Sequence, residues 1–219
     1  MALQLFAHPF SSYCQKALIA LYENATPFEF RSLDAEHPQN WAEFMGLWPI
    51  GKFPVLLDKG EPIPEATTIV EHLAVHHPGP VKLVPDDAAA AVEVRFLDRF
   101  FDNYVHTPQG KIVTDRLRQE AERDPRGVAD ARKQLEASYT WLERWLEGRE
   151  WASDYGFSLA DCSAGPALFY ADWTHEIGPE FKTVRAYRER LMKRPSFARA
   201  IEEARPYRKL FPLGAPDRD

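Results

Sequence analysis

Cysteine is scarce in this chain, which holds only Cys14 and Cys162 among 219 residues. Two cysteines do not make the disulfide framework of a small secreted domain, and they suit a reducing compartment. The N-terminal stretch MALQLFAHPF also lacks the charged start and the long apolar core of a signal peptide. We therefore expect a cytoplasmic protein.

Long apolar runs and an excess of basic charge are absent as well. No apolar run approaches the roughly 20 residues of a membrane-spanning helix, so the sequence predicts no contact with a membrane. The formal net charge of −6 offers nothing overall to offset the repulsion of a phosphate backbone, so we expect no nucleic-acid partner. The remaining composition, 45% hydrophobic and 27% charged, is typical of a globular protein of one or two domains.

The first 77 residues alternate between strand and helix patterns in the order β-α-β-α-β-β-α. A strand–helix–strand unit of about 30 residues predicts that its two strands are parallel. The whole order predicts a small mixed sheet with helices on its faces. The expected strands are Leu3–Ala7, Phe28–Leu33, Phe53–Asp58 and Glu61–Ile63, and the expected helices are Ser12–Tyr22, a short one within Asn40–Ile50, and Glu65–His76.

A linker rich in Pro and Gly, residues 78–88, separates this part from a second part with helical periodicity. We expect residues 89–219 to form an all-helical bundle. Its first helix carries an apolar stripe at four-residue steps, which should be mostly core and partly face an interdomain cleft. That stripe consists of Val92, Phe96, Phe100 and Tyr104, and the expected helices are Ala91–Val105, Asp130–Gly148, Phe157–Trp173, Phe181–Pro195 and Ser196–Ala204.

Ser158 and Asp161 have the spacing of a capping box at the start of one of these helices. In such a box the serine side chain accepts from the backbone three residues on, and the acid accepts from the backbone of the serine. The pair predicts a buried helix start with a structural role.

The segment FSSYC, Phe10 to Cys14, joins the first strand to the first helix. The free N–H groups and positive dipole of a helix N-terminus favour an anion there. Ser11 could donate a hydrogen bond to such an anion, with Ser12 as its main competitor. Capping alone is the simpler alternative for Ser11, because serine is a favoured N-cap residue. Cys14 has no cysteine partner at position 11, so we expect Cys14 to be a small buried apolar residue and not a redox-active thiol.

Two further segments suggest what the anion is. A cis Phe53–Pro54 bond at the entrance of a strand would leave the backbone of Phe53 free to pair with an extended peptide. The helix that begins near Glu65 offers free N–H groups to a carboxylate, while Glu65 itself would pair with an ammonium group. A ligand with peptide character, an α-amino acid end and an anionic group near Ser11 satisfies all three segments.

The order and spacing of FSSYCQKALIAL, GKFPVL, PEATTIVEHL and FSLADCSAGPALF resemble the cytosolic glutathione transferases, in a serine-type, bacterial-like class. The resemblance covers nearly all of the chain. It implies a thioredoxin-like glutathione-binding domain at residues 1–77 and an all-helical domain at 89–219 that supplies the electrophile pocket. It also implies glutathione as co-substrate, a homodimer, and no metal.

By this resemblance, Ser11 activates the glutathione thiol as a thiolate for attack on a small apolar electrophile. Lowering a thiol pKa by one unit needs about 1.4 kcal/mol, and one hydrogen bond to a charged group contributes roughly 1.5–3 kcal/mol. A decrease of one to two units is thus within reach of this turn. The other implied positions are Glu65 and Ala66 for the γ-glutamyl end, Phe53 and cis-Pro54 for the cysteinyl backbone, Lys52 and Gln39 for the glycyl end, and Phe10 and Tyr104 for the electrophile.

Two residues depart from the family pattern. Ala66 stands where these transferases usually carry a serine, so one hydroxyl donor worth about 1 kcal/mol is missing, although Thr67 could compensate. Ser11 replaces the cysteine of reductase-like classes, which disfavours thiol–disulfide exchange.

Other functions stay open on the sequence. Arginines lining the pocket would favour a glutathione-dependent isomerase of small acids. Ala66 favours a non-catalytic binding or regulatory protein, whereas the intact Ser11 turn disfavours one. His72 and His76 have the i, i+4 spacing of a metal pair, but no further Cys or His completes a ligand set.

Overall fold

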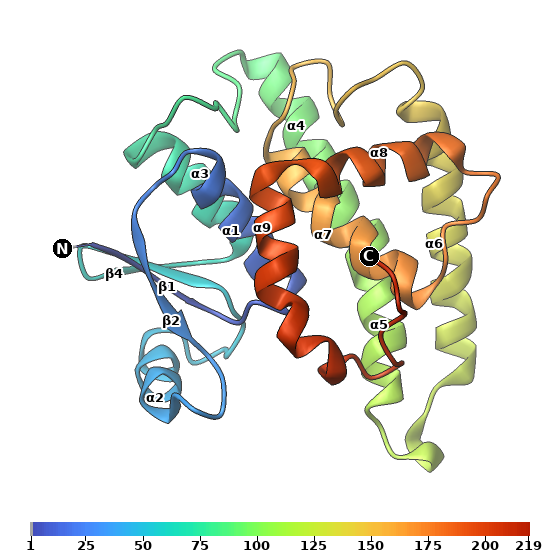
Figure 1. Ribbon diagram of the computed structural model, residues 1–219, viewed down its shortest axis with the longest axis horizontal. Helices are drawn as coiled ribbons and strands as arrows, with labels where there is room; N and C mark the ends of the chain where they lie inside the picture. The colour runs from blue at the N-terminus through green and yellow to red at the C-terminus, as the bar shows by residue number, and fades with distance from the viewer. Residues whose placement is uncertain (1) are drawn as a thin grey trace.

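The computed structural model describes residues 2–219, and its first part is a four-stranded mixed sheet with three helices (Figure 1). The elements are β1 (Leu3–Ala7), α1 (Ser12–Glu23), β2 (Phe28–Ser32), α2 (Pro38–Leu47), β3 (Val55–Asp58), β4 (Glu61–Pro64) and α3 (Ala66–His76). In the strand order β2-β1-β3-β4, β1 and β2 are parallel and the other pairs are antiparallel. The predicted thioredoxin-like order and the parallel first pair are confirmed.

Side chains that alternate along β1 build two separate cores. Leu5 and Ala7 are fully buried and belong to the large core that contains the apolar faces of α1 and α3. Phe6, which lies between them, is fully buried in a smaller core with Phe44 of α2. Because successive residues of a strand point to opposite faces, α2 covers the opposite face of the sheet from α1 and α3 (Figure 1).

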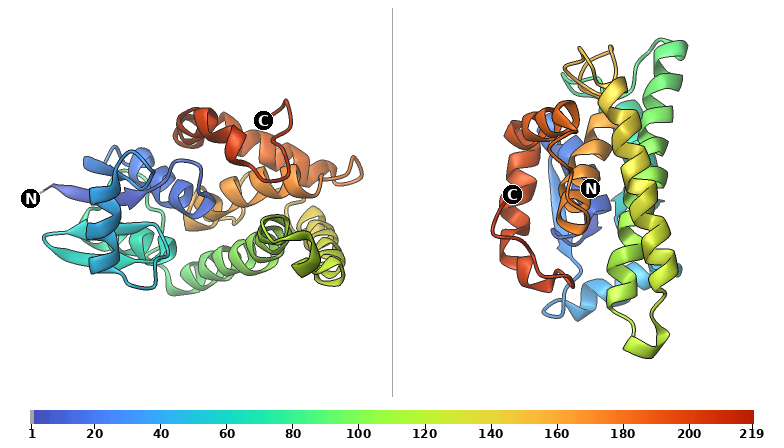
Figure 2. Two further views of the ribbon diagram at one scale, coloured as in Figure 1. Left: turned by 90° about the horizontal axis from the view of Figure 1, so that it is seen from below. Right: turned by 90° about the vertical axis from the view of Figure 1, so that its right-hand side faces the viewer.

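The rest of the chain is helical, as predicted, and is arranged around α7. The elements are α4 (Ala88–Phe100), η1 (Phe101–His106), α5 (Thr107–Arg116), η2 (Glu120–Glu122), α6 (Pro125–Trp145), α7 (Leu159–Thr174), α8 (Lys182–Lys193), α9 (Pro195–Ala204) and η3 (Arg205–Leu210). Every residue of α7 is buried, and Figure 2 shows it between α8 and α9 on one side and α4 to α6 on the other. Each helix within residues 2–219 is too short or too polar to cross a bilayer.

The predicted capping box starts α7 inside this bundle. Both reciprocal bonds between Ser158 and Asp161 are present, and the Asp161 carboxylate also accepts from the Ala152 N–H at 2.9 Å and from the Tyr187 hydroxyl at 2.6 Å. A buried helix end needs such acceptors because its first N–H groups have no partners within the helix. The structural role expected for this pair is confirmed.

The apolar stripe of the first helix in this half faces the surface and not the core, so that part of the prediction is wrong. Val92, Phe96 and Tyr104 are 66%, 46% and 47% exposed, and of the stripe only Phe100 is buried. The buried side of the continuous helix formed by α4, η1 and α5 is instead made by Ala91, Val94, Leu97, Phe101 and Val105. A helix that is apolar on two sides does not reveal from periodicity which side packs inward.

Lys16 of α1 connects the sheet half to the helical half through a fully buried ammonium group. Its Nζ donates to Asp102 Oδ2 at 3.0 Å and to Thr67 Oγ1 at 2.8 Å, and it also pairs with Asp98. Thr67 donates in turn to Asp98 at 3.0 Å, and Ser163 of α7 donates to Asp102 at 3.0 Å. Since buried charges require partners at close range, this network links α1 and α3 to the helical half, beside the apolar core that both halves share.

Replacing Lys16 with Met should lower the free energy of unfolding by about 3–5 kcal/mol, because two buried carboxylates lose a cation. The matched control is Lys82→Met, which removes the exposed ion pair of Lys82 with Asp86 and should leave stability nearly unchanged. Urea unfolding followed by tryptophan fluorescence measures both. Equal stability of the two variants would show that the buried network does not join the halves.

Candidate functional site

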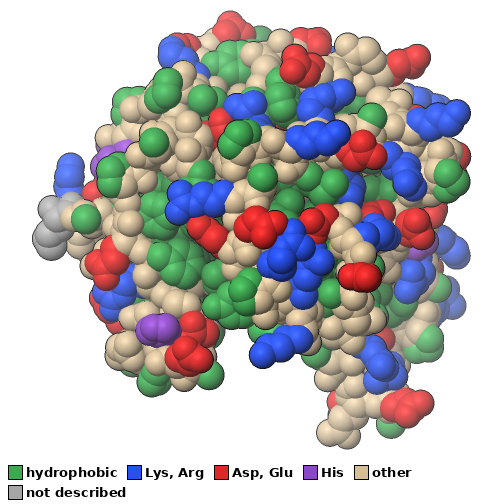
Figure 3. Space-filling model, viewed as in Figure 1, with side chains coloured by type: hydrophobic (Ala, Val, Ile, Leu, Met, Phe, Trp, Pro, Cys, Tyr) green, Lys and Arg blue, Asp and Glu red, His purple; other side chains and the backbone are tan. Residues whose placement is uncertain are grey.

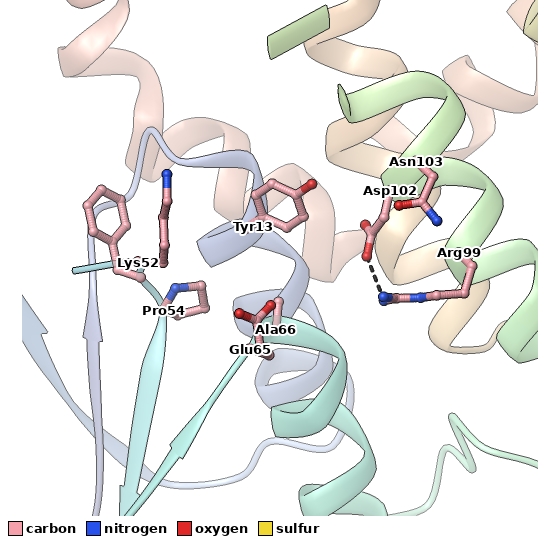
Figure 4. A pocket seen from close by; sticks show the side chains of 9 residues that line it. Tyr13, Lys52, Pro54, Glu65, Ala66, Arg99, Asp102 and Asn103 are labelled. Carbon is pink, nitrogen blue, oxygen red and sulfur yellow. Dashed lines mark hydrogen bonds and ion pairs between the residues drawn. The ribbon is translucent and has the colours of Figure 1, made fainter. Parts of the chain in front are cut away.

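A cavity of about 390 Å³ opens where the two halves meet. The sheet half contributes Tyr13, Lys52, Phe53, Pro54, Glu65 and Ala66, and the helical half contributes Arg99, Asp102 and Asn103. Figure 4 shows the two groups of side chains facing each other across this space. The strand entrance and the α3 start that the sequence singles out therefore lie together on one wall.

The entrance to β3 presents the backbone of Phe53. The Phe53–Pro54 peptide is cis, as predicted. Phe53 precedes the sheet pairing, which begins at Val55, so its N–H and C=O lie outside the ladder. Its ring is held from the far face of the sheet by Trp41 and Phe44, at centroid distances of 6.0 and 6.4 Å.

The start of α3 is strained and uncapped. Glu65 has φ +71°, a left-handed value that is uncommon for a residue with a side chain. Its side chain makes no capping hydrogen bond, so the first N–H groups of α3 keep their capacity to bind a carboxylate. Such strain persists where the surrounding structure maintains it, often at binding sites.

Thr67 does not replace the hydroxyl that Ala66 lacks. Its Oγ1 donates to Asp98 at 3.0 Å and accepts from Lys16 at 2.8 Å and from Arg99. The hydroxyl is thus engaged in the buried network and is not available to a ligand at this helix start.

The hydroxyl-rich turn lies at a second cavity of about 440 Å³ that adjoins the first. The two cavities share Tyr13 and Phe53 as walls. The second is mainly apolar, and no arginine or lysine is among its lining residues, which include Phe10, Ser11, Ser12, Tyr170 and Phe211. Figure 3 shows the molecule hollowed at its lower edge, between the sheet half and the end of α5.

Ser11 caps α1 and is still able to bind a ligand. Its Oγ accepts from the Cys14 N–H at 3.4 Å, and its backbone is extended, as is usual for an N-cap. A hydroxyl has one donor and two acceptor positions, so capping leaves its proton free to be donated. The capping and activating roles of Ser11 are therefore compatible.

Tyr13 is a candidate that the sequence reasoning missed, although it stands inside the FSSYC segment. Its ring lies 4.6 Å from that of His106, and its hydroxyl points toward the helix that carries Asp102 and Asn103 (Figure 4). Burial and the charge of Asp102 raise the pKa of Tyr13. The phenol therefore stays protonated and can donate a hydrogen bond at the junction of the two cavities.

Arg99 and Asp102 were also missed, because they come from the other half of the chain. The Arg99 guanidinium donates to Asp98 at 2.8 Å and to Asp102 at 2.7 Å. Burial opposes ionisation of Asp102, but its contact with His106 and the charge of Lys16 hold its pKa well below the usual range. The cavity is therefore walled by an ion pair whose charges largely neutralise each other.

Two residues proposed from the sequence lie outside both cavities. Gln39 is at the second position of α2 with an exposed side chain, on the helix that covers the far face of the sheet. Tyr104 lies on the outer face of η1 against Phe100, at a centroid distance of 5.4 Å. The wider turn of this π-helix directs Asp102, Asn103 and His106 toward the cavities instead. The other predicted positions line one cavity or the other.

Neither cysteine presents a thiolate. Both are fully buried, and burial raises the pKa of Cys14 to about 12 and that of Cys162 well above its usual value. The chain at this turn therefore lacks the nucleophilic sulfur of a thiol–disulfide oxidoreductase.

Because burial raises the pKa of Cys14 to about 12, its thiol stays protonated at pH 8. We expect native protein incubated with iodoacetamide at this pH to remain unmodified at both positions, as measured by intact mass. The same treatment in urea is the control and should label both thiols. Rapid labelling of Cys14 in the folded protein would contradict this account of the site.

Comparison with known families agrees with this geometry. Residues 5–81 match the family model described as glutathione S-transferase, N-terminal domain, and residues 98–195 match glutathione S-transferase, C-terminal domain. Together the two matches take in most of the chain.

The curated relatives are named for different functions. The chain is 31% identical over 130 residues to the glutathione S-transferase-like protein LUC7 of Fusarium sp, covering 59% of each. It is 26% identical to FtsZ-localized protein A of Caulobacter vibrioides, covering 86% of each, and 24% identical to a stringent starvation protein A homolog of Haemophilus influenzae, covering 92% of this chain and 91% of the relative. The chain thus spans about three fifths of LUC7 and most of the other two.

Solved structures with glutathione or a derivative share the fold. The glutathione S-transferase of Methylobacillus flagellatus with glutathione bound has a TM-score of 0.81 at 25% identity, with 91% of this chain and 98% of the other covered. The transferase URE2P8 of Phanerochaete chrysosporium with oxidised glutathione has a TM-score of 0.82 at 25% identity, covering 94% and 96%. A Methylobacterium radiotolerans transferase in complex with glutathione sulfonate has a TM-score of 0.78 at 27% identity, covering 92% and 95%.

Proposed function

This chain belongs to the glutathione S-transferase family, and on that premise we propose that it activates the thiol of glutathione for attack on a small apolar electrophile in the cytoplasm. The observation that carries the proposal is the shared wall of the first cavity. Lys52, Phe53 with cis-Pro54, and the Glu65–Ala66 helix start come from separate segments and line one space. Each offers what a different part of glutathione requires.

The proposed binding mode follows from the charges on this wall. The Glu65 carboxylate pairs with the γ-glutamyl ammonium, and the N–H groups at the start of α3 bind the γ-glutamyl carboxylate. The backbone of Phe53 pairs with the cysteinyl residue in the manner of an added strand. Lys52 provides a cation for the glycyl carboxylate, whereas Gln39 lines neither cavity and is not retained in this role.

The thiol of a ligand in this mode extends toward the junction of the cavities. Three hydrogen-bond donors lie along the second cavity beside this junction: the α1 N-terminus, the Ser11 hydroxyl and the protonated Tyr13 phenol. All three favour a thiolate over a thiol. In a serine-type transferase, Ser11 would be the main donor to the thiolate. Tyr13 is the alternative donor, because it lines both cavities.

The composition of the second cavity favours an apolar electrophile. Its lining contains several aromatic rings and neither arginine nor lysine, whereas a glutathione-dependent isomerase of a small acid would need a cation for the substrate carboxylate. Arg99 does not supply one, because it lines the first cavity and is paired with Asp98 and Asp102.

A non-catalytic regulatory protein is the second candidate. The hydroxyl missing at Ala66 and the engagement of Thr67 in the buried network both reduce the donors available for glutathione. Two of the relatives are named for localisation to FtsZ or for stringent starvation, and not as transferases. The two candidates differ first in whether glutathione binds and second in whether its thiol ionises.

Ser11→Ala should lower kcat/KM for conjugation by roughly 10- to 100-fold, the equivalent of one hydrogen bond to a charged group, while the Kd for glutathione changes little. The ultraviolet absorbance of bound thiolate against pH should show its pKa raised by about one to two units. Ser12→Ala tests the other hydroxyl of the turn: with Ser11 as the donor it leaves both quantities unchanged, and a loss in Ser12→Ala alone would assign the role to Ser12. The wild-type assay should include aryl halides, peroxides and disulfides, because these separate conjugation from peroxidase and reductase activity.

The same experiment distinguishes the alternatives. If Tyr13→Phe loses conjugation activity while Ser11→Ala keeps the wild-type activity, the tyrosine and not the serine activates the thiol. Failure of the wild type to bind glutathione at millimolar concentration would overturn the transferase proposal and favour the regulatory candidate.

We also propose that the chain forms a homodimer through the exposed aromatic face of α4, η1 and α6. Phe96 and Tyr104 on this face are about half exposed, and Trp141 and Trp145 of α6 stack on each other at 5.0 Å beside Phe96. A contiguous apolar patch of this kind usually marks an interaction site.

Phe96→Glu should shift the chain to a monomer in analytical ultracentrifugation, because a charge would be buried in the interface. Leu117→Glu, at a 70% exposed position at the end of α5, is the control and should remain a dimer. A wild-type monomer at micromolar concentration would refute the dimer proposal.

A further inference from the structure

Three side chains with metal-binding groups converge near the C-terminal end of α3, away from the glutathione cavity at its start. Asp58 ends β3, His72 lies on α3, and His77 is the residue that terminates this helix. Asp58 Oδ2 lies 3.0 Å from His72 Nε2 and 2.7 Å from His77 Nε2. All three donor atoms are within 4.8 Å of one another.

We propose that Asp58, His72 and His77 form a binding site for a divalent transition metal, with zinc as the best fit. Zinc binds imidazole nitrogen and carboxylate oxygen at about 2.0–2.2 Å, so tetrahedral ligand atoms lie ~3.3 Å from one another. The observed separations from Asp58 are a few tenths of an ångström shorter. A small rotation of each imidazole away from the carboxylate would lengthen these two separations to the values that zinc requires.

The surroundings of the three ligands suit a bound ion. The Asp58 side chain is 9% exposed, and those of His72 and His77 are 20% and 27% exposed. The carboxylate is thus held in the protein while the imidazoles reach solvent, which leaves a route of entry and a fourth position for water. Two neutral imidazoles and one carboxylate also leave a net charge of +1 on the occupied site, a smaller charge to bury than that of the free ion.

The structure changes which histidines belong together. The sequence spacing pairs His72 with His76, and their rings are indeed 4.4 Å apart. The nitrogen atoms that meet at Asp58, however, are those of His72 and His77, because the chain leaves the helical conformation at His77 (φ −137°, ψ 53°). His76 is therefore a neighbour with the same chemistry that lies outside the cluster, and it provides a matched control.

A metal at this position would have a structural and not a catalytic role. It would join the end of β3, the last turn of α3 and the start of the segment that leads to the helical half. The proposed glutathione contacts are at the opposite end of α3, about 15 Å away by the rise of an α-helix. Binding of the ion to the folded chain alone should raise its thermal stability.

The test uses untagged, full-length protein stripped of metal by a chelator and titrated with ZnCl₂ against a chromophoric competitor. We expect one zinc ion per chain, and a weakening of at least about tenfold in His72→Ala and in His77→Ala. His76→Ala should bind as the wild type does. Zinc should also raise the unfolding temperature of the wild type and of His76→Ala, but not that of the other two variants.

Titration with CoCl₂ gives a second readout that does not depend on stability. A visible absorption band of a four-coordinate cobalt site is expected in the wild type and lost in His77→Ala, with circular dichroism confirming that each variant is folded. The proposal is overturned if the wild type binds no zinc at a concentration of 100 μM, or if His76→Ala and His77→Ala weaken binding equally. In either case the cluster is a hydrogen-bonded link between β3 and α3 only.

Discussion

The buried ammonium group of Lys16 is the polar contact that links the two halves next to the candidate site. A charge that is completely removed from water must find opposite charges at close range. Here it finds Asp98 and Asp102 from the helical half and the Thr67 hydroxyl from the start of α3. The same network places Arg99 opposite Glu65, and so it also forms the far wall of the first cavity.

This arrangement divides the candidate site into a polar and an apolar space that meet at Tyr13 and Phe53. The polar space has helix starts, a strained glutamate and a paired arginine, which suit a zwitterionic peptide. The apolar space has aromatic walls, which suit a hydrophobic reactant. Because the thiol of the proposed ligand would lie at the boundary, the hydroxyls of Ser11 and Tyr13 are the groups best placed to affect it.

The two ends of helix α3 differ in what they could bind, and at both ends the backbone conformation is the reason. At its start, free N–H groups and the positive φ of Glu65 create a place for a carboxylate. At its end, the departure from helical geometry turns His77 toward Asp58 and His72. The end of α3 also leads into the segment between the halves, so a ligand at either end would act on an element that both halves share.

The sequence by itself determined the local structure: the strand and helix order, the cis bond before Pro54, the capping box of α7 and the strand and helix starts that line the first cavity. These depend on short-range rules of periodicity, proline geometry and capping, which act within a few residues. Only the tertiary structure decided that Val92, Phe96 and Tyr104 face outward, that Arg99 and Tyr13 line the site, and that His77 and not His76 joins His72. Those outcomes depend on which face of each helix is buried against a distant segment, and contacts between residues far apart in the chain leave no trace in local pattern.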